Sequence, residues 1–257
     1  LGLGAIVGTG VFALTGLVAA KYSGPAVTVS YAIAGFICIF VALVYTELST
    51  TLPTSGSIYT YSYVAFGEVF AWMVGSIIIM ELGFASAAVA ISWSAYVQGI
   101  MDSAGTHLPT AIANSNDGVL NLPALLIVLF IGSILYLGTK ESKKLNNILV
   151  AIKMTAIFIF VFFAAPHFDI ANWDNFMPHG FDDVLFGSSI LFFAFTGFGI
   201  LASAAEECKN PKKDLTIGII GSLVLATVVY IIVGAVLTGI VPFADLTNEI
   251  AVQWTKD

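Results

Sequence analysis

The chain has 257 residues, of which 58% are hydrophobic and only 10% are charged, and its mean hydropathy is +0.97. A soluble domain usually carries about 25% charged residues, so this composition argues against a soluble protein with buried helices. The formal net charge is -7, and all nine basic residues are lysine. The chain opens within an apolar segment at Leu1 and lacks a start methionine, so we expect a fragment truncated at both ends.

Seven apolar runs follow one another along the sequence. They cover residues 1–20, 26–46, 69–100, 121–138, 145–165, 184–204 and 215–241. Because a helix needs ~20 apolar residues to span the hydrocarbon, the fourth run is marginal, and the third must tilt or extend beyond the bilayer. The pattern predicts an all-α polytopic protein of the plasma or cytoplasmic membrane. Since no linker divides the chain, we expect one transmembrane domain over residues 1–257.

The lysines are unevenly distributed between the loops. Six of them lie between the fourth and fifth runs or between the sixth and seventh: Lys140, Lys143, Lys144, Lys209, Lys212 and Lys213. The opposite loops contain acidic residues and almost no lysine. The positive-inside bias therefore predicts that the lysine-bearing loops are cytoplasmic and that the first helix runs from inside to outside. The stretch from Leu52 to Phe66, on the same side, is predicted to form a short interfacial turn.

Two of the runs are interrupted by glycine at matching depths. The first contains Gly8-Thr9-Gly10, and the sixth contains the stretch from Phe193 to Gly199. Gly10 lies eleven residues before Lys21, and Phe193 lies ten residues after Asp183. At 1.5 Å per residue, each break is ~15 Å from the outer surface, which is about half of the hydrocarbon core. Backbone leaves helical geometry inside a membrane only where it lines a cavity or is buried in protein.

This pairing predicts inverted repeats. If a repeat holds five helices, the sixth helix enters from the opposite side and is the antiparallel counterpart of the first. The first repeat would cover about residues 1–165, and the second would begin at about 184 and continue to 257. Two broken helices in equivalent places are typical of the midplane binding site of a secondary transporter.

The chemistry of the two breaks is complementary. At Gly8-Thr9-Gly10, a new half-helix N-terminus would offer N–H groups to a carboxylate, with the Thr9 hydroxyl as a further donor. A small-residue packing seam is the equally weighted alternative for this motif. In the sixth run, Gly197 and Gly199 would free the carbonyls of Phe193 and Ala194, which favour a cation. Together the two breaks fit the zwitterion of an amino acid.

Two charged residues lie within the apolar runs. Lys153 is nine residues beyond Lys144, or ~13 Å inside the cytoplasmic end. A charge at this depth is a functional-site hypothesis, so Lys153 is a candidate either for reversible proton binding or for a fixed cation beside the first break. Glu81, in the third run, is a candidate accessory group of the pocket, although a structural role is equally compatible with its position.

Three stretches carry a resemblance to the amino acid–polyamine–organocation transporter superfamily, in the branch related to cationic amino acid transporters. Residues 4–12 resemble its first-helix motif, and residues 192–199 with 204–211 resemble its sixth-helix signature. Leu145-Asn146-Asn147 with Ile152-Lys153 resembles its fifth helix. The resemblance implies a five-plus-five inverted-repeat fold in which only about seven helices are present here.

The resemblance also implies roles for single residues. The first-helix motif would bind the substrate carboxylate, and the carbonyls of both breaks would bind the amino group. These substrate-binding positions are Ile6, Gly8, Thr9, Gly10, Phe193, Ala194, Thr196 and Gly197. Lys153 would occupy a sodium-like site and support proton coupling, and Glu81 would lie near the pocket. Gly199 stands where many relatives carry an acidic residue, which argues against basic substrates.

We therefore expect secondary active transport of amino acids by alternating access, as a proton-coupled symporter of small neutral amino acids. The nearest rival is a proton-independent exchanger, and a third hypothesis is an amino-acid-binding membrane sensor. We expect no enzymatic activity, because no catalytic cluster lies within the runs. We also expect no metal or other cofactor, with the proton as coupling ion. The expected partners are an amino acid substrate and membrane lipid, without nucleic acid.

Overall fold

The computed structural model describes residues 2–11, 13–113, 120–137, 139–203, 208 and 210–243, and within these ranges the side chains of Thr9, Thr110, Leu137, 139–145, Pro211 and Lys212 are not described. Every regular element in the described part is helical. Several predictions on lysine and acidic side chains fall outside it, including those for Lys140, Lys143, Lys144 and Lys209. The Thr9 hydroxyl and the signature residues 204–207 are likewise outside the described part.

Five helical stretches are long and apolar enough to cross a membrane. They are Ala13–Thr51, Glu68–Ser103, Asn146–His167, Phe181–Ala202 and Lys213–Ile240. The first joins the outer part of run 1–20 to run 26–46, but the chain changes direction within it at Gly24, where φ is +57°. The marginal fourth run forms α7 (Leu122–Leu137), which at 16 residues is shorter than a full span. The expected all-α polytopic fold is confirmed.

The first run is broken as predicted. It forms α1 (Gly2–Ile6), a bend at Val7-Gly8, the 3-10 turn η1 (Thr9–Val11), and then α2 (Ala13–Val18). A π-helical turn η2 (Ala19–Ser23) and the 3-10 turn η3 (Gly24–Ala26) lead into α3 (Val27–Thr51). Glycine at position 8 lets the chain leave helical geometry in mid-run, because it lacks the Cβ that restricts other residues.

The sixth run is broken in the same manner. α9 (Phe181–Leu191) continues into the 3-10 turn η6 (Phe192–Phe195), and a turn at Thr196-Gly197 precedes α10 (Phe198–Ala202). Gly197 has a φ of +126°, which L side chains rarely adopt. This geometry explains why a glycine stands at the point where the helix restarts.

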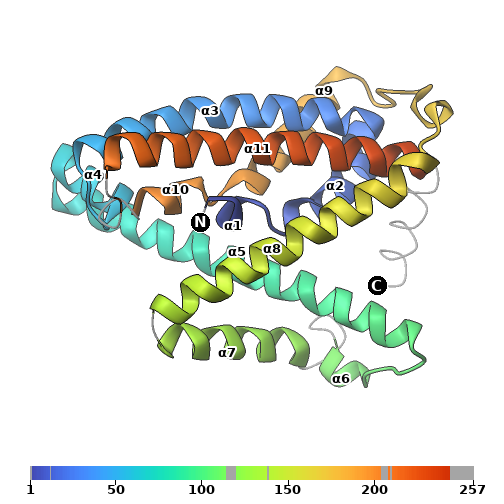
Figure 1. Ribbon diagram of the computed structural model, residues 1–257, viewed down its shortest axis with the longest axis horizontal. Coiled ribbons are helices and arrows are strands. Elements are labelled where there is room, and N and C mark those ends of the chain that lie inside the picture. Colours follow the sequence, from blue (N-terminus) through green and yellow to red (C-terminus); the bar gives the residue numbers. More distant parts are fainter. Residues whose placement is uncertain are drawn as a thin grey trace.

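The long helices α3 and α11 (Pro211–Ile240) lie side by side along their whole length (Figure 1). They are antiparallel, since Tyr31 meets Tyr230 while Gly35 meets Thr227. A Cβ on Gly35 would lie 2.5 Å from the Thr227 hydroxyl oxygen, so the small residue permits this close approach. The pair forms a continuous wall against which the broken segments pack.

Of the remaining helices, α4 (Ser57–Phe66) lies at one end of the molecule, and the others lie on the other side of the broken segments (Figure 1). They are α5 (Glu68–Ser103), α6 (Thr110–Ala113), α7 and α8 (Thr139–Ala164). The 3-10 turns η4 (Ala165–His167) and η5 (Ile170–Trp173) follow α8. The prediction of a short turn between Leu52 and Phe66 was wrong, because the ten-residue helix α4 fills most of this stretch.

The ends of α7 and α10 and the starts of α8 and α11 lie at the same end of the molecule as α4 (Figure 1). The connections that carry the lysines therefore join elements at one end, as the charge pattern requires. The assignment of this end to the cytoplasm remains a prediction.

Candidate functional site

The two broken segments cross each other at their breaks. Contacts pair α1 with α10, η1 with η6 and α2 with α9, so the segments run antiparallel. At the crossing, a Cβ on Gly10 would lie 2.6 Å from the Ala194 Cβ, and one on Gly197 would lie 2.5 Å from the Ala5 carbonyl oxygen. These two glycines let the backbones of the segments come into direct contact. The antiparallel crossing is the relation that the inverted-repeat prediction requires between the first and sixth helices.

Gly8 differs from Gly10 in its surroundings. It is exposed, and a Cβ built on it would meet nothing within 4 Å. Gly10 is buried against the sixth segment. The open space of the first break therefore lies at Gly8. Gly10 instead packs against the sixth segment, as the alternative interpretation of this motif as a small-residue packing seam expects.

Lys153 reaches the first break from α8. Its ammonium Nζ donates a hydrogen bond to the Gly4 carbonyl at 2.9 Å and another to the Val7 carbonyl. These oxygens belong to the last turn of α1 and to the bend that follows it. Because a cation at a helix C-terminus satisfies orphan carbonyls and opposes the negative end of the helix dipole, the half-buried Lys153 caps α1. The ammonium of Lys153 thus lies beside the first break, and its role in coupling stays a prediction.

The carbonyls expected to receive an amino group already have donors from the protein. The Tyr230 hydroxyl on α11 lies 2.8 Å from the Ile6 oxygen and 2.9 Å from the Ala194 oxygen, so it bridges the two segments. The Phe193 oxygen accepts the Thr196 hydroxyl at 2.7 Å and the Thr196 N–H at 3.2 Å. A carbonyl oxygen has two lone pairs, so the Ile6 and Ala194 oxygens can each accept a further donor, whereas both lone pairs of the Phe193 oxygen are already used.

The aromatic residues of the sixth segment divide into two kinds. Phe195 is fully buried between Tyr31 and Tyr230, and Phe198 packs edge-on against Tyr45 of α3. Phe193, in contrast, keeps 42% of its surface exposed. Of the three, Phe193 is therefore the one available to line a pocket, while Phe195 and Phe198 belong to the core.

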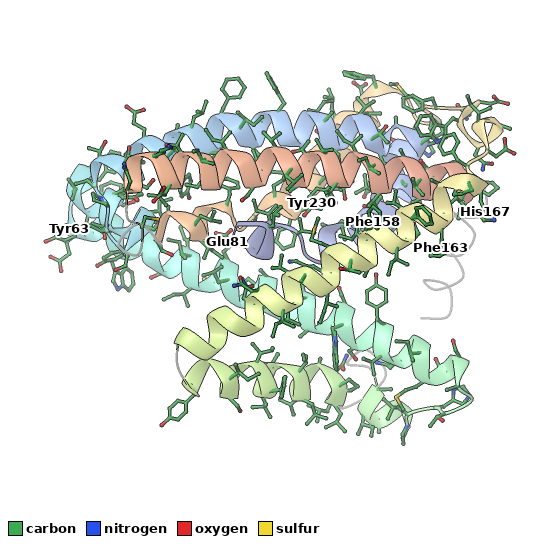
Figure 2. All side chains as sticks on the ribbon, viewed as in Figure 1. Tyr63, Glu81, Phe158, Phe163, His167 and Tyr230 are labelled. Atoms are coloured by element: carbon green, nitrogen blue, oxygen red, sulfur yellow. The ribbon has the colours of Figure 1, made fainter. Side chains whose placement is uncertain are left out.

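Glu81 is not brought into contact with the break. Its side chain on α5 is exposed. Figure 2 shows Glu81 in the central part of the molecule, between Tyr63 at one end and His167 at the other. The role of Glu81 as an accessory group of the pocket remains a prediction.

Sequence reasoning missed Tyr230, Tyr31 and Thr15, which supply the buried hydroxyl groups around the first break. Figure 2 shows Tyr230 near the middle of the molecule, where α11 passes the broken segments. The sequence position of Tyr230 could have indicated it, because Tyr230 lies in the middle of an apolar run, whereas tyrosines of membrane proteins favour the interfaces. Tyr31 lies near the start of its run, where an interfacial position is equally expected.

A family model described as "Amino acid permease" matches residues 1–254. The chain belongs to this family. As a permease-family member with five apolar helical stretches, it is a multi-pass membrane protein. Within the described residues, no group of three or more His, Cys, Asp or Glu side chains could hold a metal ion.

The chain is similar to bacterial and eukaryotic transporters. It is 45% identical over 254 residues to the branched-chain amino acid permease BcaP of Bacillus subtilis, covering 96% of this chain and 54% of that protein. It is 41% identical over 250 residues to the methylthioribose transporter of the same organism, with coverages of 96% and 54%. Cationic amino acid transporter 4 of Homo sapiens is 34% identical over 264 residues, with coverages of 98% and 41%. The chain spans about half the length of these relatives, and the resemblance to the cationic branch is confirmed.

Proposed function

We propose that the full-length protein transports small neutral amino acids across the membrane by alternating access, coupled to protons. This proposal is supported above all by one observation: the two broken helices contact each other at their breaks, and the Lys153 ammonium donates a hydrogen bond to the Gly4 carbonyl beside the first break. One break offers space beside a restarting helix, and the other offers backbone carbonyls. This combination suits a substrate with one anionic and one cationic end.

The carboxylate would enter at Gly8. The N–H groups at the start of a helical turn lack intrahelical acceptors, and the helix dipole favours an anion there. Thr9 and Gly10 begin that turn, and the space beside Gly8 is open. The amino group would use the second lone pairs of the Ile6 and Ala194 oxygens. The Phe193 oxygen already accepts two hydrogen bonds from Thr196, so Phe193, Thr196 and Gly197 would shape the turn beside the amino group.

Lys153 would couple this site to the proton gradient. While protonated, it holds the Gly4 and Val7 carbonyls through charge-assisted hydrogen bonds, which are about twice as strong as neutral ones. Loss of the proton would leave an amine that holds α1 less firmly. Proton binding and release would thus alternately fix and free the inner half of the first segment.

A neutral substrate is favoured by the surroundings of Gly199. A Cβ at this position would lie 3.2 Å from the Tyr45 ring, so the aromatic ring occupies the place where a carboxylate would recognise a basic side chain. The bacterial relatives are named for branched-chain amino acids and for methylthioribose. Apolar side chains and a thioether share low polarity, so the substrate panel should contain both.

A proton-independent exchanger is the second candidate. It is favoured by the fact that Lys153 is already paired with two carbonyls, which suits a permanent structural cation. A membrane sensor would bind amino acids at the same breaks without moving them.

The test is uptake of radiolabelled alanine, leucine and methylthioribose by proteoliposomes that contain the full-length protein, with and without an inward proton gradient. Lys153→Met removes the coupling group, and Lys213→Met removes an exposed lysine at the start of α11 as a matched control. Accumulation driven by the gradient in the wild type and in Lys213→Met, but not in Lys153→Met, would support symport. Uptake that depends only on internal amino acid would favour the exchanger, and binding without flux would favour the sensor.

A further inference from the structure

A buried pair of hydroxyl groups lies against the outer side of the first break. The Tyr31 hydroxyl on α3 is 2.8 Å from the Gly10 carbonyl and 2.7 Å from the Thr15 hydroxyl on α2. Thr15 in turn lies 2.5 Å from the Val11 carbonyl. Tyr31 and Thr15 are both fully buried, so water does not substitute for these contacts.

The two hydroxyl groups have too few hydrogen atoms to make a hydrogen bond at every short contact. Each hydroxyl carries one hydrogen, and the three short oxygen–oxygen contacts need three. Either Thr15 donates to Tyr31 and Tyr31 to Gly10, or Tyr31 donates to Thr15 and Thr15 to Val11. In a third arrangement both hydroxyls donate to carbonyls, and the Gly10 oxygen also lies 3.3 Å from the Thr15 hydroxyl. In the first arrangement the Gly10 carbonyl is satisfied by Tyr31, and in the second the Val11 carbonyl is satisfied by Thr15. The pair therefore acts as one unit on the Gly10 and Val11 carbonyls of η1.

The turn needs this support because its own backbone bond is long. The Val11 N–H reaches the Gly8 carbonyl at 3.3 Å, beyond the common 2.9–3.0 Å range for such bonds. Gly10 is held between Tyr31 on one side and Ala194 of η6 on the other. The orientation of the N–H groups of η1 thus depends on side chains that never face the open space at Gly8.

We propose that Tyr31 and Thr15 are positioning residues for the substrate carboxylate, because they hold the η1 turn that presents its N–H groups beside Gly8. This inference rests on the proposed amino acid transport. Neither residue touches the substrate. Both act through the carbonyls of Gly10 and Val11. The Tyr31 ring also packs edge-on against Phe195 of the second break, with the ring centroids 6.3 Å apart.

The experiment uses the full-length protein in detergent, with two readouts on each variant. Equilibrium binding of radiolabelled amino acid gives Kd and the number of sites, and amide hydrogen exchange follows residues 8–13. Tyr31→Phe keeps the ring and removes the hydroxyl, Thr15→Val removes the partner, and Thr15→Ser restores a hydroxyl. Thr46→Val is the matched control, since buried Thr46 makes the same bond to the carbonyl four residues earlier, in mid-α3.

We expect Tyr31→Phe to raise Kd about tenfold with the number of sites unchanged, since a satisfied carbonyl loses its donor. Amide exchange at residues 8–13 should rise in the same variant. Thr15→Val should raise Kd less, because Tyr31 can still serve Gly10, and the double variant should cost less than the sum of the two. Thr15→Ser and Thr46→Val should bind like the wild type.

An unchanged Kd in both Tyr31→Phe and Thr15→Val would overturn the proposal, whatever happens to the number of sites. A fall in the number of sites with the same Kd would identify a purely structural role, which also overturns it. If Tyr31→Phe does not fold, Thr15→Val and its Thr15→Ser rescue decide. Failure of the wild type to bind any amino acid would instead refute the proposed function, whereas wild-type binding unaffected by the variants would refute only this inference.

Discussion

Tyr31 and Tyr230 hold the two sides of a single helix break from neighbouring helices. Their ring centroids are 5.0 Å apart, and the hydroxyl of Tyr31 binds the Gly10 carbonyl while that of Tyr230 binds the Ile6 carbonyl. The outer side of the break is thereby tied to α3 and the inner side to α11. Since α3 and α11 pack along their whole length, the opening at Gly8 is set by a rigid pair of helices.

Tyr230 should contribute measurably to stability. Tyr230→Phe retains the ring but leaves the buried carbonyls of Ile6 and Ala194 without this donor. We expect the free energy of unfolding to fall by about 1–3 kcal/mol, the usual cost of an unsatisfied buried group. Denaturant titration of the purified full-length protein would measure it. Unchanged stability would mean that other donors replace the hydroxyl.

The two glycines of the first motif should respond differently to alanine. Gly8→Ala adds a methyl group to open space, so we expect it to weaken amino acid binding at least about tenfold while stability stays within about 0.5 kcal/mol. Gly10→Ala drives a methyl group into Ala194 and should cost about 1–3 kcal/mol of stability. Binding isotherms and unfolding curves of both variants check this. Equal effects of the two substitutions on stability would contradict the assignment of the open space to Gly8.

Gly197 is required by its backbone conformation and by its contact with α1. Gly197→Ala combines a φ of +126° with a Cβ 2.5 Å from the Ala5 oxygen, so we expect a loss of about 3 kcal/mol or more. The control is Gly221→Ala on α11, where a Cβ meets nothing within 4 Å. That variant should gain about 0.5–1 kcal/mol from helix propensity. Thermal unfolding would compare them, and a tolerated Gly197→Ala would argue against the described turn.

Ser57 offers a stabilising substitution. Among the described residues it is the one that is not glycine and has a positive φ, at +47°. Left-handed geometry costs a residue with a Cβ roughly 1–2 kcal/mol, and glycine avoids most of this cost. Ser57→Gly should therefore exceed Ser57→Ala in stability by about 1 kcal/mol, because both lose the hydroxyl and only glycine relieves the backbone. Equal melting temperatures for these two variants would disprove the strain.

The sequence was sufficient wherever the cause is local. Glycine-containing breaks in the first and sixth runs follow from backbone freedom, and both appear where expected. The depth of Lys153 follows from helical rise, and its ammonium does reach the first break. The turn predicted between Leu52 and Phe66 was wrong, because a ten-residue helix starts just after Gly56.

The partners of the freed carbonyls were decided only by the tertiary structure. Tyr230 meets Ile6 across 224 positions and Tyr31 meets Gly10 across 21, and neither separation leaves a periodic trace in the sequence. The close packing of α3 with α11 brings these hydroxyls to the break. Glycine spacing and apolar length thus determined where the helices span and break, because those properties depend on neighbouring residues. Which side chains satisfy the broken backbone depends on how distant helices pack, because a hydrogen bond requires proximity in space and not in sequence.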